Sequence, residues 1–277
     1  MFHDTAAAGG RPVTEVAPGI HLISDYHLDN YYLVEGEDRA LLIDCGAGIG
    51  DPWPEIRALT SKPVTLALTH GHMDHCGNAD KFARVLMHPD DAALAREHFG
   101  HADKTRWFVR TRTPVRYPGH EAELLALVPR EDRPLFAFAP VRGGDRLDLG
   151  GRTLEVIATP GHTSGSLCYL DTRSRLLFSG DTLNDSIIVL DEGHGTREGV
   201  AQLRETMQTL AARYADFDAI LPGHEDAPAP KDRILAYLDL CNRLLDGSLR
   251  GRYEERGIRA GHVVRGGGVE FWYRADR

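Results

Sequence analysis

The stretch "THGHMDHCG" at residues 69–77 concentrates metal-binding side chains. It places His70, His72, Asp74 and His75 within six positions. Imidazole nitrogens and carboxylate oxygens are the ligands that zinc and neighbouring first-row metals take in proteins. In an extended loop His70 and His72 point the same way, because side chains alternate with a period of two, and a following turn can bring Asp74 and His75 towards them. The stretch therefore predicts the floor of a metal site.

Composition is that of an ordinary folded chain. With 277 residues and 42% hydrophobic content the chain is long enough for a well-buried core, and we expect a single domain spanning residues 1–277. The formal net charge of −9 argues against a nucleic-acid partner, because phosphate binding needs clustered Lys and Arg. We therefore expect a small-molecule substrate. The sequence leaves the oligomeric state open, with a homodimer as one option.

Targeting and cross-linking signals are not recognisable in the sequence. The first ten residues contain no cationic start followed by an apolar core, so no signal peptide is expected. No apolar run approaches the roughly 18 residues of a membrane helix. The four cysteines are far apart and show no CxxC pairing, which predicts neither a disulfide framework nor a Cys-based zinc site. These features favour a reducing, cytoplasmic location without a membrane partner.

Two successive blocks of the chain combine short apolar runs, typical of strands, with longer runs that have one apolar face, typical of helices. The first block contains predicted strands at 19–25, 30–36, 39–48, 63–69 and 84–88, and predicted helices at 52–60, near 78–84 and from residue 89. The second contains predicted strands within 145–162, 166–181 and 218–224, predicted helices at 198–214 and 230–246, and one last strand in 266–275. This layout predicts two packed sheets with helices outside.

Residues 100–140 depart from the pattern, with scattered Arg, Pro and aromatic residues and one helical run at 121–128. We interpret residues of about 95–145 as an inserted helical lid and residues of about 230–277 as a helix-strand extension. The basic residues of the lid either bind an anionic substrate or form a solvated face; they are Lys104, Arg106, Arg110, Arg112 and Arg116. Its aromatic residues either line a substrate pocket or form a satellite core; they are Trp107, Phe108 and Tyr117.

Three later residues follow a predicted strand, as the opening motif does. His162, Asp181 and His224 each follow an apolar strand, in "EVIATPGH", "RLLFSGD" and "DAILPGH". Each one alone fits a loop residue with a satisfied hydrogen bond. Strand ends on one edge of a sheet converge in space, so the three together predict partners for the histidines at 69–77.

The full set resembles the metallo-β-lactamase superfamily, whose pattern HxHxDH, then H, D and H, is matched in order by this chain. The matching residues are His70, His72, Asp74, His75, His162, Asp181 and His224. The aspartate of "LLIDCG", Asp44, matches a further family position. The resemblance covers residues of about 15–230. It implies an α+β fold, a four-layer αβ/βα sandwich, with two metals at one edge between the sheets.

The resemblance also implies a role for each residue. One metal is held by His70, His72 and His162, the second by Asp74, His75 and His224, and Asp181 bridges the two. We expect two divalent ions, zinc first, with iron and manganese as alternatives. Such a pair activates a bridging hydroxide and polarises the carbonyl that it attacks. Asp74 then serves as the catalytic residue that relays the proton to the leaving group, and Asp44 supports the ligand loop from behind.

Sequence differences between members of the superfamily restrict the set of reactions that we expect of this chain. Asp181 stands where typical resistance β-lactamases have Cys or Ser, so the chain is closer to members that resemble glyoxalase II and the lactonases. We therefore expect a hydrolase that cleaves a small-molecule acyl C–O or C–S bond in a thioester, lactone or ester. The alternatives are a non-hydrolytic iron redox or sensor protein, a phosphodiesterase or nuclease-like member, and a β-lactamase.

Residues that contact substrate are harder to assign. The segment after Asp181 offers Asn184, Asp185 and His194 as candidate substrate-binding residues, or as solvated turn residues. The other histidines are expected to be replaceable at little catalytic cost; they are His88, His98, His101, His120 and His262.

Overall fold

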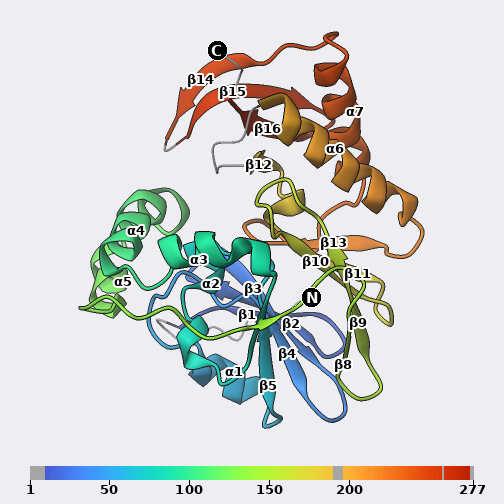
Figure 1. Ribbon diagram of the computed structural model, residues 1–277. Helices are drawn as coiled ribbons and strands as arrows, with labels where there is room; N and C mark the ends of the chain where they lie inside the picture. Colours follow the sequence, from blue (N-terminus) through green and yellow to red (C-terminus); the bar gives the residue numbers. More distant parts are fainter. Residues whose placement is uncertain (1–9, 190–195, 258, 275–277) are drawn as a thin grey trace.

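Two β-sheets pack face to face at the centre of the protein, and helices cover their outer faces (Figure 1). The computed structural model describes residues 10–189, 196–257 and 259–274. The succession of helices, sheet, sheet and helices confirms the predicted α+β sandwich of four layers.

The first sheet has seven strands that follow the order of the sequence. They are β1 Val13–Ala17, β2 Ile20–Asp25, β3 Asp29–Glu35, β4 Ala40–Ile43, β5 Val64–Ala67, β6 Val85–Met87 and β7 Ala139–Pro140. Neighbours are antiparallel from β1 to β4 and parallel from β4 to β7. In β4, Leu41 and Ile43 pack between the sheets while Ala40 and Leu42 face the helices, because strand side chains alternate.

Short helices close the outer face of the first sheet. They are α1 Trp53–Leu59, α2 Met73–Cys76 and α3 Ala92–His98, with single 3-10 turns η1 Ala79–Lys81 and η2 Pro89–Asp91. Ile56 of α1 and Ala95 of α3 are fully buried against Leu42 and Leu66 of the sheet. This burial fixes the loops that join strands to helices, and the opening motif lies in one of those loops.

The second sheet has five strands in the order β13-β11-β10-β9-β8. Their bounds are β8 Arg146–Asp148, β9 Thr153–Ala158, β10 Leu167–Asp171, β11 Leu176–Gly180 and β13 Ala219–Pro222. All neighbours are antiparallel except β11 and β13. Helices α6 Thr196–Ala212 and α7 Arg233–Leu245 cover its outer face through buried residues such as Leu203 and Leu240.

A third, four-stranded sheet lies beyond α6 and α7 (Figure 1). It contains β12 Ser186–Ile188, β14 Arg252–Arg256, β15 Arg259–Gly266 and β16 Val269–Tyr273. Strand β12 follows η3 Asp181–Leu183 and pairs in parallel with β16. The fold therefore joins the segment after Asp181 to the C-terminal part of the chain.

Two helices, α4 Ala102–Arg116 and α5 Glu121–Leu127, form the insertion between β6 and β7 (Figure 1). Phe108, Val109 and Leu124 pack with Leu28 and Met73 in a separate apolar cluster. The lid is therefore anchored on the loops around the opening motif.

Several details of the sequence-based prediction differ from the structure, among them the short strands β1 and β7, which were not expected. The helix expected near 78–84 is only the turn η1, because Phe82 is extended and its ring packs on Trp53. Helix α4 was not expected, since Arg, Thr and Pro114 obscure its buried positions. The single last strand is a set of three, and β12 was also not expected. The charged residues that hid these strands pair with one another across the sheet, as Arg265 does with Glu254.

The described part of the chain contains no helix whose length and apolar character suffice to cross a membrane.

The third sheet is held by a buried carboxylate, Glu270. It accepts hydrogen bonds from Arg265 Nε at 2.8 Å and Trp272 Nε1 at 2.9 Å, and also from Ser186 and Arg256. Burial raises the pKa of Glu270, but the hydrogen bonds from Ser186, Trp272 and Arg265 outweigh it and lower the pKa to about 2. The folded-state pKa is thus below the ordinary value of 4.5, so the stabilisation is present above that value and disappears as pH falls towards 2.

We predict that Glu270→Gln lowers the free energy of unfolding by about 1–3 kcal/mol at pH 7. The difference between variant and unmodified protein should shrink as pH falls below about 4.5, which urea titrations at pH 7, 5 and 3.5 measure. Glu254→Gln is the control, because the Glu254 side chain is more exposed than that of Glu270 and should contribute less to the free energy of unfolding. A difference that is independent of pH would contradict the assignment.

Candidate metal centre

The seven predicted ligands come from loops that follow the strands of both sheets. His70 and His72 lie between β5 and α2, and Asp74 and His75 lie within α2. The remaining three follow β9, β11 and β13 in the second sheet: His162, Asp181 and His224. The structure brings all seven together at one edge of the sandwich, and their ligand atoms form three overlapping groups whose members lie within 4.8 Å of one another.

Glycines next to the ligands let the two sheets approach closely. Gly180, before Asp181, has a φ of 46°, and a Cβ atom there would lie 2.4 Å from Thr69 Oγ1. At Gly223, before His224, a Cβ atom would lie 2.6 Å from Asp181 Oδ1. The glycines in "SGD" and "PGH" are therefore required by the packing around the site.

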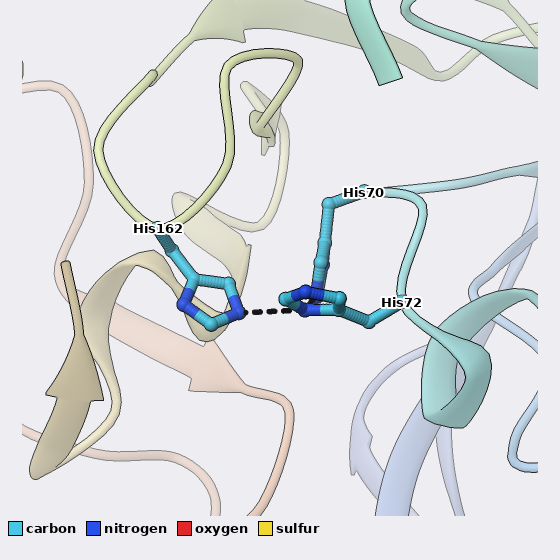
Figure 2. Close-up of side chains that lie close together, drawn as sticks. All are labelled: His70, His72 and His162. Atoms are coloured by element: carbon cyan, nitrogen blue, oxygen red, sulfur yellow. Dashed lines mark hydrogen bonds between the residues drawn. The ribbon is translucent and has the colours of Figure 1, made fainter. Parts of the chain in front are cut away.

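Three imidazoles form the first group (Figure 2). The Nδ1 atom of His72 lies 3.0 Å from His70 Nε2 and 2.9 Å from His162 Nε2. All three side chains are buried. Nitrogens that share a tetrahedral zinc with bonds of about 2.0–2.1 Å lie about 3.3 Å apart, so three nitrogens at the observed spacing fit one metal ion.

The second group contains Asp74, His75 and His224. The Nε2 atom of His224 lies 3.5 Å from Asp74 Oδ2. Asp181 lies between the two groups, with Oδ2 at 3.2 Å from His224 Nε2 and at 3.6 Å from His162 Nε2. One carboxylate oxygen therefore reaches a histidine of each group, which is the position that a bridging ligand needs.

Two buried polar atoms without a hydrogen-bond partner in the described part of the chain indicate whether a cation fits between the ligands. Among the residues that the structure describes, His75 Nε2 and Asp181 Oδ1 have no hydrogen-bond partner, although they lie only 3.2 Å apart. His75 Nδ1 lies 2.8 Å from Asp44 Oδ2, to which it donates when it carries the ring proton. The Nε2 atom then presents a lone pair towards an anionic oxygen, and a metal ion between them satisfies both.

Charge in the site also suits a cation. Burial and the neighbouring imidazoles hold the pKa of His70 and His72 well below the ordinary value, so these rings are neutral, the form that binds metals. Burial raises the pKa of Asp181, but His224 and His75 outweigh it and hold that pKa well below its usual range. His70 and His72 therefore offer neutral nitrogen donors close to an ionised carboxylate.

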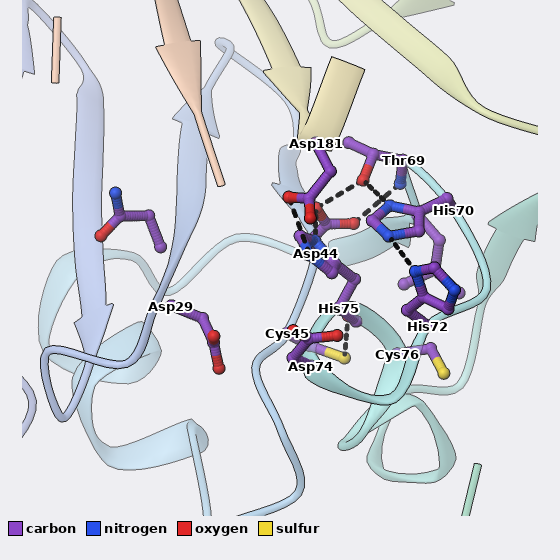
Figure 3. A network of polar contacts seen from close by, with 12 residues as sticks. Asp29, Asp44, Cys45, Thr69, His70, His72, Asp74, His75, Cys76 and Asp181 are labelled. Atoms are coloured by element: carbon purple, nitrogen blue, oxygen red, sulfur yellow. Dashed lines mark hydrogen bonds and ion pairs between the residues drawn. The ribbon is translucent and has the colours of Figure 1, made fainter. Parts of the chain in front are cut away.

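Asp44 supports the histidine loop from behind (Figure 3). Its Oδ1 accepts from the Thr69 backbone N–H at 2.7 Å, and its Oδ2 accepts from Thr69 Oγ1 at 2.7 Å and from His75 Nδ1. Thr69 Oγ1 in turn lies 3.0 Å from His70 Nδ1. One carboxylate thus orients two rings of the site, the arrangement that the sequence predicts for Asp44.

Asp29 and His98 were not foreseen in the site. Asp29 is 1% exposed, and its Oδ1 lies 3.1 Å from His224 Nδ1. Burial raises the pKa of Asp29 to about 7 against the lowering effect of His224. The ring of His98, which was expected to be replaceable, has its centroid 4.9 Å from that of His72. No local sequence signal marks either residue, because each meets its partner only through tertiary packing.

Asp91 ties together the two loops that carry the first group. Its Oδ2 accepts from the Gly71 N–H and from Thr163 Oγ1, both at 2.8 Å, and its Oδ1 accepts from the Gly165 N–H at 2.6 Å. The carboxylate therefore joins the loop of His70 to that of His162, and its hydrogen bond with Gly165 spans 74 positions of sequence.

A cavity of about 1140 Å³ lies in front of the ligands. Its lining includes the predicted substrate residues Asn184, which is buried, and Asp185, which is exposed. The third candidate, His194, lies outside the described residues. Of the lid aromatics, Trp107 and Phe108 line the cavity, whereas Tyr117 packs beside the apolar cluster of the lid.

Comparison with known proteins identifies the family. Residues 27–224 match the model of the metallo-beta-lactamase superfamily. The chain belongs to the metallo-β-lactamase superfamily. Membership in the superfamily confirms the resemblance seen in the ligand pattern, and the protein is a metal-dependent hydrolase.

Curated relatives and solved structures share this scaffold. The acyl-coenzyme A thioesterase MBLAC2 of Gallus gallus is 31% identical over 205 residues, which cover 70% of this chain and 72% of that protein. The Homo sapiens protein of the same name is 30% identical over 213 residues, with the same coverage. A metallo-beta-lactamase family protein from Thermus thermophilus superposes with a TM-score of 0.52 at 20% identity, covering 84% of this chain and 80% of that one. The last similarity shows the fold alone.

We predict that Asp91→Asn weakens the coupling of the two ligand loops. The amide has one acceptor oxygen, so either the Gly71 or the Gly165 N–H loses its partner. We expect a loss of about 1–3 kcal/mol in the free energy of unfolding and a loss of roughly tenfold or more in metal affinity, measured by urea unfolding and by chelator competition.

Asp90→Asn is the matched control, because the Asp90 side chain is 64% exposed and adjacent in sequence. Equal effects of the two substitutions, or an unchanged metal affinity in Asp91→Asn, would show that the contact does not position the ligands.

Proposed function

We propose that the protein holds two divalent metal ions, zinc in preference to iron or manganese. His70, His72 and His162 hold the first, Asp74, His75 and His224 hold the second, and Asp181 bridges them. The spacing of the ligand atoms and the position of Asp181 between the groups support this assignment. The mixture of imidazole and carboxylate donors favours zinc over the harder cations.

We further propose that the reaction is hydrolysis of a small-molecule acyl thioester. The observation that carries the proposal is the similarity to acyl-coenzyme A thioesterases over 70% of the chain. The cavity supports it, since members of the ligand cluster line a space that is large enough for a substrate with two distinct halves. Lactone and simple ester hydrolysis use the same chemistry and are the nearest alternatives.

The chain's own residues serve three tasks in this reaction. Bound divalent ions lower the pKa of a water molecule and polarise the acyl carbonyl. Asp74, whose side chain is 14% exposed and lines the cavity, accepts the proton of the attacking water and delivers it to the departing thiolate. Asp44 and Asp29 hold the rings of His75 and His224, and Trp107 and Phe108 flank the substrate space.

A substrate panel tests the reaction. We expect the zinc-loaded protein to hydrolyse an acyl-coenzyme A and an acyl-N-acetylcysteamine with a kcat/KM at least about tenfold above those for a lactone, a simple ester, a β-lactam and a phosphodiester, equivalent to roughly 1.4 kcal/mol. Release of free thiol gives the rate. If thioesters are inert while a lactone or a phosphodiester turns over, the thioesterase proposal is wrong.

Replacement of the bridging carboxylate tests the metal centre. We predict that Asp181→Ala binds fewer than two metal ions and loses roughly 100-fold or more in kcat/KM, because the carboxylate that lies near histidines of both groups is removed. Plasma mass spectrometry measures the metal content, and circular dichroism checks the fold. Asp226→Ala is the control, since this nearby carboxylate is exposed, lies outside the ligand groups and does not line the cavity. Two metals at full occupancy in Asp181→Ala would exclude a bridging role.

A further inference from the structure

The cavity in front of the ligands has two walls made by segments far apart in sequence. One wall is the lid helix α4, which contributes Trp107, Thr111 and Arg112. The other is the third sheet, with β12 and residues of β14 to β16. Pockets for small ligands usually enclose about 300–1,000 Å³, so a volume of about 1140 Å³ exceeds what an acyl thioester group alone requires.

Five arginines lie on these two walls, beside the acids Asp185 and Glu270, in a protein whose formal net charge is −9. The arginines that line the cavity are Arg112, Arg116, Arg256, Arg259 and Arg265. Two of them come from the lid and three from the third sheet. The sequence left two interpretations for the basic lid residues, an anion-binding role or a solvated face. Arg112 and Arg116 line the cavity, while Lys104 and Arg106 pair with acids elsewhere.

The lid arginines are not neutralised by the protein. Among the residues that the structure describes, no carboxylate lies within ion-pair distance of Arg112 or Arg116. The Arg112 guanidinium lies over the Phe108 ring of its own helix, with its Cζ atom 5.7 Å from the ring centroid. The charge of Arg112 is therefore available to a ligand.

The sheet arginines are held in place by side chains of the third sheet. Glu270 binds Arg256 and Arg265 through separate oxygens, and Ser186 accepts from Arg259. Arg259 approaches Glu270 only to 3.9 Å and keeps 21% of its side chain exposed. Burial, followed by the charge of Arg112, lowers the pKa of Arg259. The two guanidinium groups of lid and sheet therefore repel each other across the cavity, and an anion between them relieves the repulsion.

We propose that Arg112 and Arg259, assisted by Arg256, bind phosphate groups on the thiol half of the thioester substrate while its acyl carbonyl lies at the ligand cluster. Guanidinium groups suit this task because their planar N–H donors match phosphate oxygens in pairs. The thiol half of a coenzyme A-type substrate carries phosphate groups. The inference rests on the thioesterase function proposed above, and it adds the part of the substrate that the protein recognises away from the reacting bond.

Two thioesters with the same acyl group separate phosphate recognition from catalysis. Acyl-coenzyme A carries phosphates on its thiol half and acyl-N-acetylcysteamine does not. We expect Arg112→Gln to lower the ratio of their kcat/KM values at least tenfold, mainly through KM for acyl-coenzyme A, and Arg112→Gln with Arg259→Gln to lower it roughly 100-fold. Arg110→Gln is the control, because Arg110 is exposed on the same helix and does not line the cavity.

Binding of adenosine 3′,5′-bisphosphate gives a readout that needs no turnover. Calorimetry on the metal-loaded protein should show binding that weakens at least tenfold in Arg112→Gln and stays unchanged in Arg110→Gln. If the unmodified protein binds the bisphosphate but hydrolyses no thioester, the anion site is supported and only the proposed thioesterase function is wrong. No binding, or an Arg112→Gln ratio equal to that of the unmodified protein, would overturn the anion site.

A third thioester locates the anion on the substrate. Succinyl-N-acetylcysteamine carries its charge on the acyl half and has no phosphate. If Arg112→Gln raises KM for this compound as much as for acyl-coenzyme A, the arginines recognise the acyl half, and the assignment to the thiol half is wrong. An unchanged KM for this compound supports the assignment.

Discussion

Burial of several imidazoles and carboxylates at one point is the constraint on which this structure depends. His70, His72 and His162 place nitrogens 2.9–3.0 Å apart, and Asp181 lies within 3.6 Å of nitrogens from both ligand groups. Dehydrated polar groups cost free energy unless each has a partner. In the proposed metal centre, bound cations would supply that partner for the inward-facing atoms. The outward-facing atoms have partners in the protein: Asp44 accepts from His75 Nδ1, and the Leu28 carbonyl lies 3.2 Å from His224 Nδ1.

The sandwich supplies the geometry that this constraint requires. Ligands leave the ends of β5, β9, β11 and β13, so neither sheet holds a complete set. The apolar layer between the sheets fixes their separation, and Gly180 and Gly223 allow the final approach. Asp91 adds a polar link between the two loops that carry His70 and His162. The metal centre is thus a product of the contact between the two halves of the chain.

The proposed metal ligands and most of the cavity arginines lie in different parts of the molecule. The ligands lie within residues 27–224, the part that matches the superfamily model. Strands β14 to β16 lie after it, and they supply Arg256, Arg259 and Arg265 to the cavity. The lid helix α4 is an insertion between strands of the first sheet. A scaffold of this kind keeps one chemistry at the sheet edge while the added segments define the rest of the cavity.

The sequence alone was sufficient for the fold class, for the strands that precede the predicted ligands and for the seven residues that the structure brings together at the sheet edge. These depend on short-range features: "THGHMDHCG" contains four ligands in one loop, and His162, Asp181 and His224 directly follow apolar strands. Only the tertiary structure decided the residues around them. Asp29 and Asp91 meet partners distant in sequence, and the charged strands of the third sheet become recognisable only through their cross-strand pairs. The physical reason is that ligand type and strand alternation are local properties, whereas the neighbour of a buried carboxylate is set by how the layers pack.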